Sequence, residues 1–126
     1  MAAQTVLIPL FRDEIAPRFD LAGEAMLVSF DDDQGETSRA TILLAHSSAE
    51  ELCRMALEAP AAVVICNGIE EEYWQYLRWK RVDVLDNVMG PAEVTLDRWR
   101  QGRLRSGDIL FERAGPADAG PAEGTP

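Results

Sequence analysis

The pattern of apolar residues changes partway along the chain, and this change limits the folds open to it. The first part holds three short strand-like runs, TVLIPLF at 5–11, AMLVSFD at 25–31 and ATILLA at 40–45. Afterwards, stretches with helical spacing alternate with two further apolar runs, AAVVIC at 61–66 and VDVLD at 82–86. Three successive strands followed by alternating helices and strands predict an α/β domain, in which helices pack on a mixed sheet.

Turn and cap signals mark the first boundaries. The polar segment DDDQG at 31–35 lies between the second and third runs and predicts a hairpin with a glycine in its turn. Ser47 and Ser48 each precede a glutamate by three residues, which is the spacing of a capping box. We therefore expect a helix to begin there and to end at Pro60.

Two more helices are expected in the second half. One covers about 69–78 and carries three glutamates near its start, where carboxylates suit the positive end of the helix dipole. The other covers 90–102, with Pro91 in its first turn and Gly102 as its stop. The predicted order of elements is β-β-β-α-β-α-β-α.

Length and composition favour one domain. The chain has 126 residues, of which 47% are hydrophobic, and this is enough for one core but not for two. We assign 1–113 to a single α/β domain. The remainder, AGPADAGPAEGTP at 114–126, offers almost no apolar surface to bury, so we predict a disordered tail of alanine, glycine and proline.

The charge balance argues against several classes of partner. With 22 acidic and 12 basic residues the formal net charge is -10, and the resulting field repels nucleic acid and anionic membranes. The N-terminal apolar run contains Pro9 and ends at Arg12, unlike a signal peptide, and no stretch reaches the ~20 apolar residues of a membrane helix. We expect a cytoplasmic protein whose two cysteines are reduced.

Three stretches together resemble a known family. They are I-P-x7-P-R-F-D within 8–20, V-V-I-C-N-G-I at 63–69 and V-M-G-P-A-E-V-T-L-D-R-W-R-Q-G-R-L at 88–104. In order and spacing they are similar to the dinitrogenase iron-molybdenum cofactor biosynthesis family, which includes NifX, the core domain of NafY and the C-terminal part of NifB. The likeness covers roughly residues 5–105.

That resemblance implies a ribonuclease H-like fold, with a five-stranded mixed sheet and helices packed on it. It also implies a role in binding or carrying a metal-sulfur cluster, such as an iron-molybdenum cofactor. Nuclease activity is not expected, because a nuclease of this fold needs carboxylates on its first strand to hold divalent metal and TVLIPLF has none.

Loops that follow parallel strands gather at one edge of such a sheet, where ligands usually sit. The candidate cofactor-binding residues in these loops are Arg12, Arg18, Cys66, Asn67, Gly68, Asn87, Met89 and Gly90. Two of the loops lead into helix N-termini, which favour an anionic cluster or a phosphate. The alternative is that the asparagines and glycines only shape turns and caps, while the glutamates at 70–72 complement the dipole and repel an anion.

Cys66 ends an apolar run where a turn begins, and several roles are open to it. A thiolate there could bind iron, copper or molybdenum-bound sulfur, whereas a nucleophile is disfavoured because no base adjoins it. We favour the simpler role of a small buried residue. His46 is expected to be a surface or turn residue and Cys53 a core residue of the first helix, and the three show no zinc-like spacing.

Two features point to protein partners. Seven of the twelve cations form a local basic cluster in the sequence, namely Arg78, Lys80, Arg81, Arg98, Arg100, Arg103 and Arg105. They could meet an acidic partner or an anionic ligand, or simply complement helix dipoles. Trp74 and Trp79 stand about 140° apart on the second helix, so at least one should be exposed and available for a partner or for self-association.

These observations support two functions. The first is a non-enzymatic binding module, a carrier or assembly accessory for an anionic metal-sulfur cofactor that works with a cofactor-assembly protein. The second is a protein-interaction or regulatory domain that keeps the fold without a cofactor. An enzyme is not expected, because the motifs provide no nucleophile-base pair, phosphate loop or metal triad.

Overall fold

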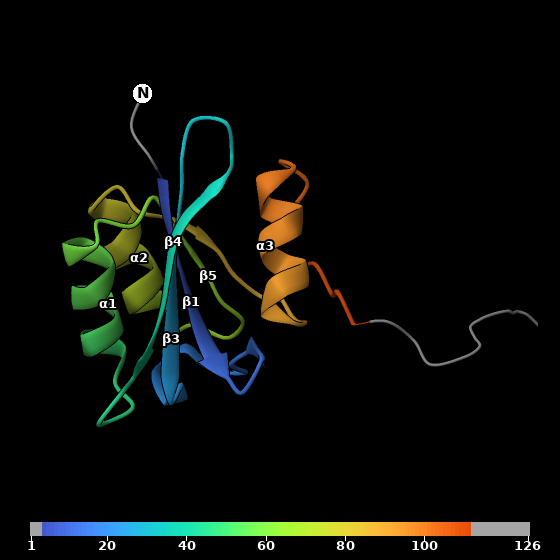
Figure 1. Cartoon of the computed structure of the whole chain (residues 1–126). Helices are drawn as coiled ribbons and strands as arrows, with labels where there is room; N and C mark the ends of the chain where they lie inside the picture. Colours follow the sequence, from blue (N-terminus) through green and yellow to red (C-terminus); the bar gives the residue numbers. More distant parts are fainter. Residues whose placement is uncertain (1–3, 112–126) are drawn as a thin grey trace, which may run out of the picture.

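A mixed sheet forms the middle layer of the molecule in the computed structural model, which describes residues 4–111 (Figure 1). Its strands lie in the order β4-β3-β1-β5-β6, with β2 paired to the end of β1. Their bounds are Gln4–Phe11 (β1), Glu14–Ile15 (β2), Glu24–Phe30 (β3), Glu36–Leu43 (β4), Val63–Ile65 (β5) and Asp83–Leu85 (β6). β3 pairs antiparallel with both β1 and β4, whereas β5 pairs parallel with both β1 and β6.

Helices cover both faces of this sheet. α1 (Ala49–Glu58) and α2 (Glu71–Trp79) lie on one face, and α3 (Ala92–Arg100) lies on the other (Figure 1). A short 3-10 turn, η1 (Phe19–Leu21), precedes β3. The expected α/β fold, with a mixed sheet and three helices, is confirmed.

The sheet has six strands where five were expected. The extra strand is β2, in which only two residues pair antiparallel with the end of β1, Leu10 with Ile15 and Phe11 with Glu14. Two residues are too few to show an alternation of apolar and polar side chains, so the sequence pattern carries no signal for this strand.

Alternation along the central strands divides the core into two parts. On β1, Leu7 packs on the side of α1 and α2, whereas Val6 and Ile8 pack on the side of α3. On β5, Val64 and Ile65 divide in the same way. Because successive side chains of a strand point to opposite faces, a strand covered on both faces must be apolar at nearly every position.

The hairpin strand β4 begins four residues earlier than the expected 40–45 and is exposed along most of its length. Its first half, ETSR at 36–39, has no apolar pattern, yet it pairs with β3 as far as Phe30 opposite Glu36. An edge strand is held by backbone hydrogen bonds to one neighbour, so polar side chains can occupy it.

The turn of this hairpin depends on a carboxylate as well as on its glycine. The Asp31 carboxylate accepts hydrogen bonds from the amides of Asp33 and Gly35, at 3.0 and 2.9 Å. The residue with a left-handed backbone is Gln34, at φ 67°, and not the glycine. Aspartate side chains commonly close turns in this way, by accepting from amides a few residues ahead.

Helix ends follow the expected signals with small shifts. Ser48 is the N-cap of α1, and its hydroxyl accepts a hydrogen bond from the Glu51 amide at 3.2 Å. α2 begins at Glu71, two residues later than expected, and Pro91 is the N-cap of α3 and not part of its first turn. Gly102 follows α3 with φ 71°, the conformation that ends a helix.

Three of the sequence-based predictions are not tested by the fold. The predicted disordered tail, residues 114–126, lies outside the described residues. The assignment of 1–113 to one domain and the cytoplasmic location also stay predictions. Among the three helices of residues 4–111, none is long and apolar enough to cross a membrane.

Candidate functional site

Three loops meet where the parallel strands end, and we call this surface the loop edge: residues 12–18 after β1, 66–68 after β5 and 86–90 after β6. Backbone hydrogen bonds join the first loop to the second. The Gly68 amide donates to the Pro17 carbonyl at 3.0 Å, and the Phe19 amide donates to the Gly68 carbonyl at 2.7 Å.

Further backbone bonds join the second loop to the third. The Asn87 amide donates to the Asn67 carbonyl, and the Val88 amide donates to the Cys66 carbonyl, both at 3.0 Å. The first loop also reaches the third, because the Ile15 amide donates to the Gly90 carbonyl at 3.0 Å. Segments more than 70 residues apart in the chain therefore form one continuous surface.

The N-terminus of α3 lies at the loop edge, and its first amide already has a hydrogen-bond acceptor within the protein. The Ala92 amide, at the first helical position, donates to the Asp13 carbonyl at 2.9 Å. The N-terminus of α2 carries Glu70 as N-cap and acidic residues in its first turn. A helix dipole thus contributes less to anion binding at the loop edge than the sequence suggested.

Two glycines of the candidate set allow the loops to approach one another. A Cβ on Gly68 would lie 3.1 Å from the Pro17 carbonyl oxygen, which is tighter than an ordinary contact. Gly90 has φ 142°, and a Cβ on it would lie 2.8 Å from the Cβ of Leu110. Gly90 requires glycine on both counts, and a side chain at Gly68 would crowd the first loop, so both positions support the structural alternative.

The two arginines of the candidate set differ in how they are held. Arg12 is exposed, has a left-handed backbone at φ 60° and lies over the ring of Phe11, 5.2 Å from its centroid. Arg18 forms a two-pronged ion pair with Asp20, at 2.8 and 3.1 Å, and is also exposed. Arg12 therefore offers its charge to solvent, whereas Arg18 shares its charge with a carboxylate.

Asparagine and methionine side chains complete the surface. Asn67 is half-buried, and Asn87 is exposed with a left-handed backbone at φ 57°, a conformation that asparagine tolerates in turns. The Asn87 side-chain amide donates to the Asp86 carboxylate at 3.4 Å. Met89 is 38% exposed at the same edge.

Neither cysteine presents a thiolate at the surface. Cys66 is 1% exposed, and its burial raises the pKa of the thiol well above its ordinary value, with Asp86 and Cys53 adding to the effect. Burial, aided by Glu50, raises the pKa of Cys53 to about 11. This placement favours packing for Cys66, and a ligand role for it stays a prediction that requires the strand end to open.

The single histidine is outside the three loops of the loop edge, although β4 runs in the same direction as β1 and therefore also ends at this edge of the sheet. His46 is exposed in the connection between β4 and α1, as the surface or turn interpretation expects. In the part of the chain that the structure describes, no three His, Cys, Asp or Glu side chains are grouped so that they could hold a metal ion.

The basic cluster of the sequence does not form one surface. Arg78, Lys80 and Arg81 lie at the end of α2, whereas Arg98 and Arg100 lie in the last turn of α3, on the opposite face of the sheet (Figure 1). Both helices follow parallel strands and run back along them, so their C-termini lie away from the loop edge. These cations are placed to complement helix dipoles, and a role with an acidic partner stays a prediction.

The two tryptophans differ in exposure, as their spacing on the helix predicts. Trp74 is half-buried against the core on the α1 and α2 side, and the Arg78 guanidinium lies 5.4 Å from its ring centroid. Trp79 is 75% exposed, with the Lys80 ammonium 4.7 Å from its ring centroid. The expectation that at least one tryptophan is exposed is confirmed.

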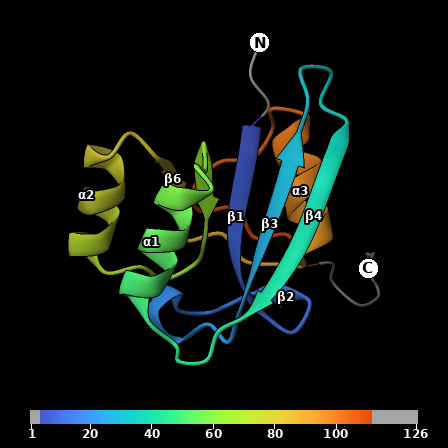
Figure 2. The same cartoon turned by 60° about the vertical axis from the view of Figure 1, so that its left-hand side comes forward.

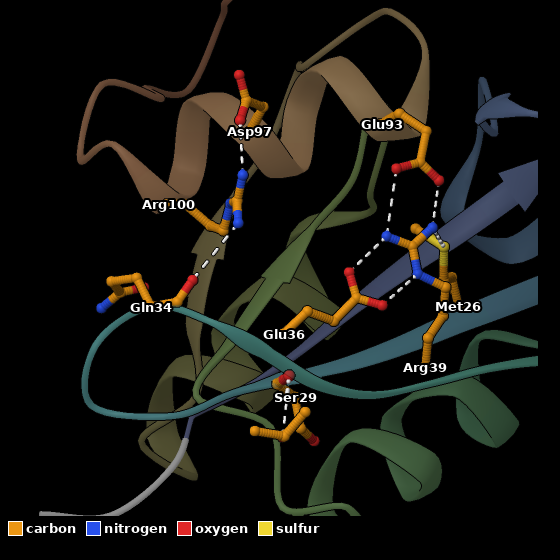
Figure 3. A network of polar contacts seen from close by, with 9 residues as sticks. Met26, Ser29, Gln34, Glu36, Arg39, Glu93, Asp97 and Arg100 are labelled. Atoms are coloured by element: carbon orange, nitrogen blue, oxygen red, sulfur yellow. Dashed lines mark hydrogen bonds and ion pairs between the residues drawn. The ribbon is translucent and has the colours of Figure 1, made fainter.

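A polar network that the sequence did not reveal ties the hairpin to α3 (Figure 3). The Arg39 guanidinium lies between the carboxylates of Glu36 on β4 and Glu93 on α3. The ion pairs raise the pKa of Arg39 and hold the pKa of Glu36 below its ordinary value. Arg100 of α3 donates to the Gln34 carbonyl in the hairpin turn at 3.5 Å. These partners are 54 and 66 residues apart, beyond any local pattern.

Comparison with known proteins identifies the fold but no family. No family model matches the chain, and no curated protein matches it. Among solved structures, a candidate dinitrogenase from Methanocaldococcus jannaschii shares 20% identity at a TM-score of 0.67, over 82% of this chain and 94% of its own.

Two other solved structures are similar over comparable lengths. A candidate NifB protein from Thermotoga shares 18% identity at a TM-score of 0.60, over 89% of this chain and 99% of its own. The apo form of the orange protein from Desulfovibrio gigas shares 16% identity at a TM-score of 0.63, over 82% and 92%. At such identities the likeness shows a shared fold and nothing finer.

Proposed function

We propose that the chain is a non-enzymatic binding module, a carrier or assembly accessory for an anionic metal-sulfur cofactor of the iron-molybdenum type. The observation that carries this proposal is the loop edge, where backbone hydrogen bonds tie three loops into one surface that exposes Arg12, Arg18 and Met89. The names of structural neighbours, a candidate dinitrogenase, a candidate NifB protein and an orange protein in apo form, support the same direction.

We also infer a ribonuclease H-like fold and membership in the dinitrogenase iron-molybdenum cofactor biosynthesis family. The strand order supports the fold, because an antiparallel β4-β3-β1 half is followed by two strands parallel to β1. All three stretches that carry the resemblance, 8–20, 63–69 and 88–104, contribute to the loop edge or to the helix that begins there. The shared position supports a common role for them.

The donors at the loop edge suit an anionic cargo held by charge and hydrogen bonding. The guanidinium groups of Arg12 and Arg18 would bind anionic sulfur or oxygen atoms of a cluster, and the Asn67 side-chain amide would donate to them. The thioether of Met89 is a soft donor suited to a metal-sulfur surface. The protonated Cys66 thiol contributes packing beneath these groups and not a metal bond.

Anaerobic reconstitution of the full chain with iron, sulfide and molybdate tests this function. We expect a bound chromophore, bound metal by elemental analysis, and amide shifts concentrated in the three loops. The double variant Arg12→Gln/Arg18→Gln should reduce uptake about tenfold, because it removes both exposed guanidiniums. The matched control Arg54→Gln/Arg78→Gln, at exposed arginines on α1 and α2, should bind as the parent does.

Cysteine variants separate packing from ligation. Cys66→Ser and Cys66→Ala should lower stability while leaving cofactor uptake by the folded fraction unchanged. Absence of both a chromophore and loop shifts would contradict the cofactor function.

The second candidate function is an interaction or regulatory domain without a cofactor. The observation in its favour is Trp79, which is 75% exposed with Lys80 over its ring. Large exposed aromatic side chains often anchor protein partners. Binding of a cofactor-assembly protein, or self-association, that is lost in Trp79→Ala and independent of metal would favour this function over the first.

A further inference from the structure

α1 and α2 lie on the face of the sheet opposite α3 (Figure 2). Side chains of these two helices line a groove between them. It has a volume of about 570 Å³. Its apolar lining comes from Cys53 and Leu57 of α1 and from Tyr73 and Tyr76 of α2. Cys53 is buried, Leu57 and Tyr73 are half-buried, and Tyr76 is 38% exposed, so the lining extends from the core out to solvent.

The charged side chains of the groove are mostly carboxylates. Glu50, Glu58 and Glu72 line it together with one cation, Arg54. Arg54 is engaged within its own helix by Glu51 and Glu58. Among residues 4–111, Glu72 takes part in no ion pair. Glu58 shares Arg54, and the Glu50 carboxylate accepts hydrogen bonds from the Ser48 and Tyr73 hydroxyls, both at 3.3 Å. With three carboxylates and one guanidinium in its lining, the groove still joins apolar surface to a net negative charge.

Both walls of the groove follow helical spacing. Cys53 and Leu57 are one turn apart on α1, and Tyr73 and Tyr76 are neighbours on α2, where the exposed Trp79 continues the row. Two such rows can accept a third helix, whose apolar residues at i, i+3, i+4 and i+7 fill the space between them. α1 is about 15 Å long, so roughly ten residues of a docked helix would be in contact.

We propose that this groove docks a cationic amphipathic helix of a partner protein, with apolar residues between the tyrosines and Leu57 and with lysines or arginines beside Glu50, Glu58 and Glu72. Complementary charge fixes the sign and orientation of the partner, and the apolar row supplies the buried area. The groove shares no residue with the loop edge, so this docking is separate from cofactor binding.

Charge favours a different protein over other occupants of the groove. A second copy of this chain carries the same net charge of -10 and is repelled at long range. The segment at 112–126 contains three acids and one arginine, so it is also unsuited to an acidic groove. An amphipathic partner helix rich in lysine or arginine complements both the negative charge and the shape of the groove.

Synthetic peptides test the proposal with the full chain. The probes are a panel of fluorescein-labelled helical peptides of about 16 residues, with leucines on one face at varied i, i+3 and i+4 spacing and lysines flanking them. Each has a matched peptide in which glutamates replace the lysines. We expect fluorescence anisotropy to show saturable binding of at least one lysine peptide, about tenfold tighter than its glutamate match and weaker at higher salt. Amide shifts should concentrate in α1 and α2.

Matched variants locate the binding. Glu72→Lys should weaken the lysine peptide about fivefold to tenfold, whereas Asp33→Lys, the same change in charge at the distant hairpin turn, should alter binding less than about twofold. Tyr76→Ala should weaken binding about tenfold through lost apolar contact. Thermal melting checks that each variant folds, and Glu72→Lys carries the test if Tyr76→Ala does not fold.

Three results would overturn the proposal. One is equal binding, or none, of the lysine and glutamate peptides across the panel. Another is lysine-peptide binding that Glu72→Lys leaves unchanged. The third is concentration-dependent dimerisation in sedimentation that Glu72→Lys abolishes, since it would assign the groove to a second copy. Cofactor uptake by folded Tyr76→Ala, a change in the second turn of α2 beyond its acidic first turn, should match the parent, so failure here is distinguishable from failure of the loop-edge function.

Discussion

The two faces of the sheet are covered in different ways, although the same strands supply both. On the α3 face, one helix is tied to the hairpin by Arg39, which joins carboxylates on β4 and α3. On the other face, Arg54 also lies between two carboxylates, but Glu51 and Glu58 both belong to its own helix. Arg39 links two elements, whereas Arg54 links none. The Tyr73 hydroxyl of α2 donates to the Glu50 carboxylate of α1 at 3.3 Å, and the groove lies between these two helices.

This difference shows that the number of ion pairs says little about what they do. Arg39 is 32% exposed and fixes the position of a helix against the sheet, so part of its effect is architectural. Arg54 is 56% exposed and serves only the local stability of α1. A face closed by a bridging ion pair suits a structural role, and a face left with an acidic groove suits docking.

The largest expected loss of stability comes from a substitution at Gly90, where the α3 face meets the loop edge. Gly90→Ala would place a Cβ 2.8 Å from the Cβ of Leu110, at a φ of 142° that other residues avoid. We expect a loss of about 2–4 kcal/mol in the free energy of unfolding, measured by urea denaturation. The control is Gly23→Ala, where no atom lies within 4 Å and φ is not left-handed. A loss as large in the control would contradict this explanation.

A pair of leucine truncations compares how tightly the two helix layers are packed. Leu96 on α3 is 3% exposed, whereas Leu57 on α1 is half-buried in the groove. Leu96→Ala should cost about 3 kcal/mol and Leu57→Ala about 1 kcal/mol, because only the first leaves an enclosed cavity. Equal costs by chemical denaturation would mean that the groove is packed as closely as the α3 face.

Removing the two arginines compares a bridging ion pair with a local one. Arg39→Ala should destabilise the chain by about 1 kcal/mol, because it separates the hairpin from α3 and leaves Glu36 and Glu93 facing each other. Arg54→Ala should cost only about 0.3 kcal/mol, the usual value for exposed pairs within a helix. Added salt should reduce the difference between the two variants in thermal melting. A larger cost for Arg54→Ala would reverse the comparison.

The smallest expected effect is a pH dependence of stability that arises at Cys53, on the face covered by α1 and α2. The pKa of Cys53 is raised from its ordinary 9.0 to about 11 by burial and by Glu50, so the folded chain keeps a proton that the unfolded chain loses. Stability from this group is fully present below pH 9 and is lost as the pH rises from about 9 to about 11. The buried Cys66 and the Tyr73 hydroxyl beside Glu50 act in the same direction.

Unfolding free energies measured between pH 8 and 11 should therefore decline, and the decline should be shallower in Cys53→Ala. Thiol labelling gives a second readout, in which both cysteines react slowly in the folded chain and quickly in urea. Rapid native labelling of Cys53 would show that the groove opens more than its burial indicates.

Much of the fold was predictable because its signals are local. The apolar runs gave the five longer strands, the Ser48 cap and Gly102 gave helix ends, and the α/β class followed from the order of elements. The two-residue β2 and the polar first half of β4 were missed, since both are held by backbone pairing to β1 or β3. Backbone pairing does not require apolar and polar residues to alternate, so the sequence pattern does not reveal it.

The candidate site was predictable only as a region. Sequence placed the three loops at one edge because strands in parallel end together, and the backbone bonds between them agree with that placement. The expectation that Cys66 is a small buried residue agrees with its burial beneath that edge. The sequence could not foresee that the Asp13 backbone carbonyl, in the first loop, accepts a hydrogen bond from the first amide of α3. Whether a residue at the end of a strand faces solvent depends on loops that arrive from elsewhere in the chain.

The sequence by itself determined the order of elements and the apolar character of the central strands, because alternation and capping act over a few residues. Only the tertiary structure decided which distant groups meet: Arg39 with Glu93, Gly68 with Pro17, and Leu57 of α1 across the groove from Tyr76 of α2. Those encounters depend on how whole helices and loops pack against the sheet. For that reason the sequence indicated which loops meet at one edge of the sheet, and the structure added an acidic groove for which the sequence contains no motif.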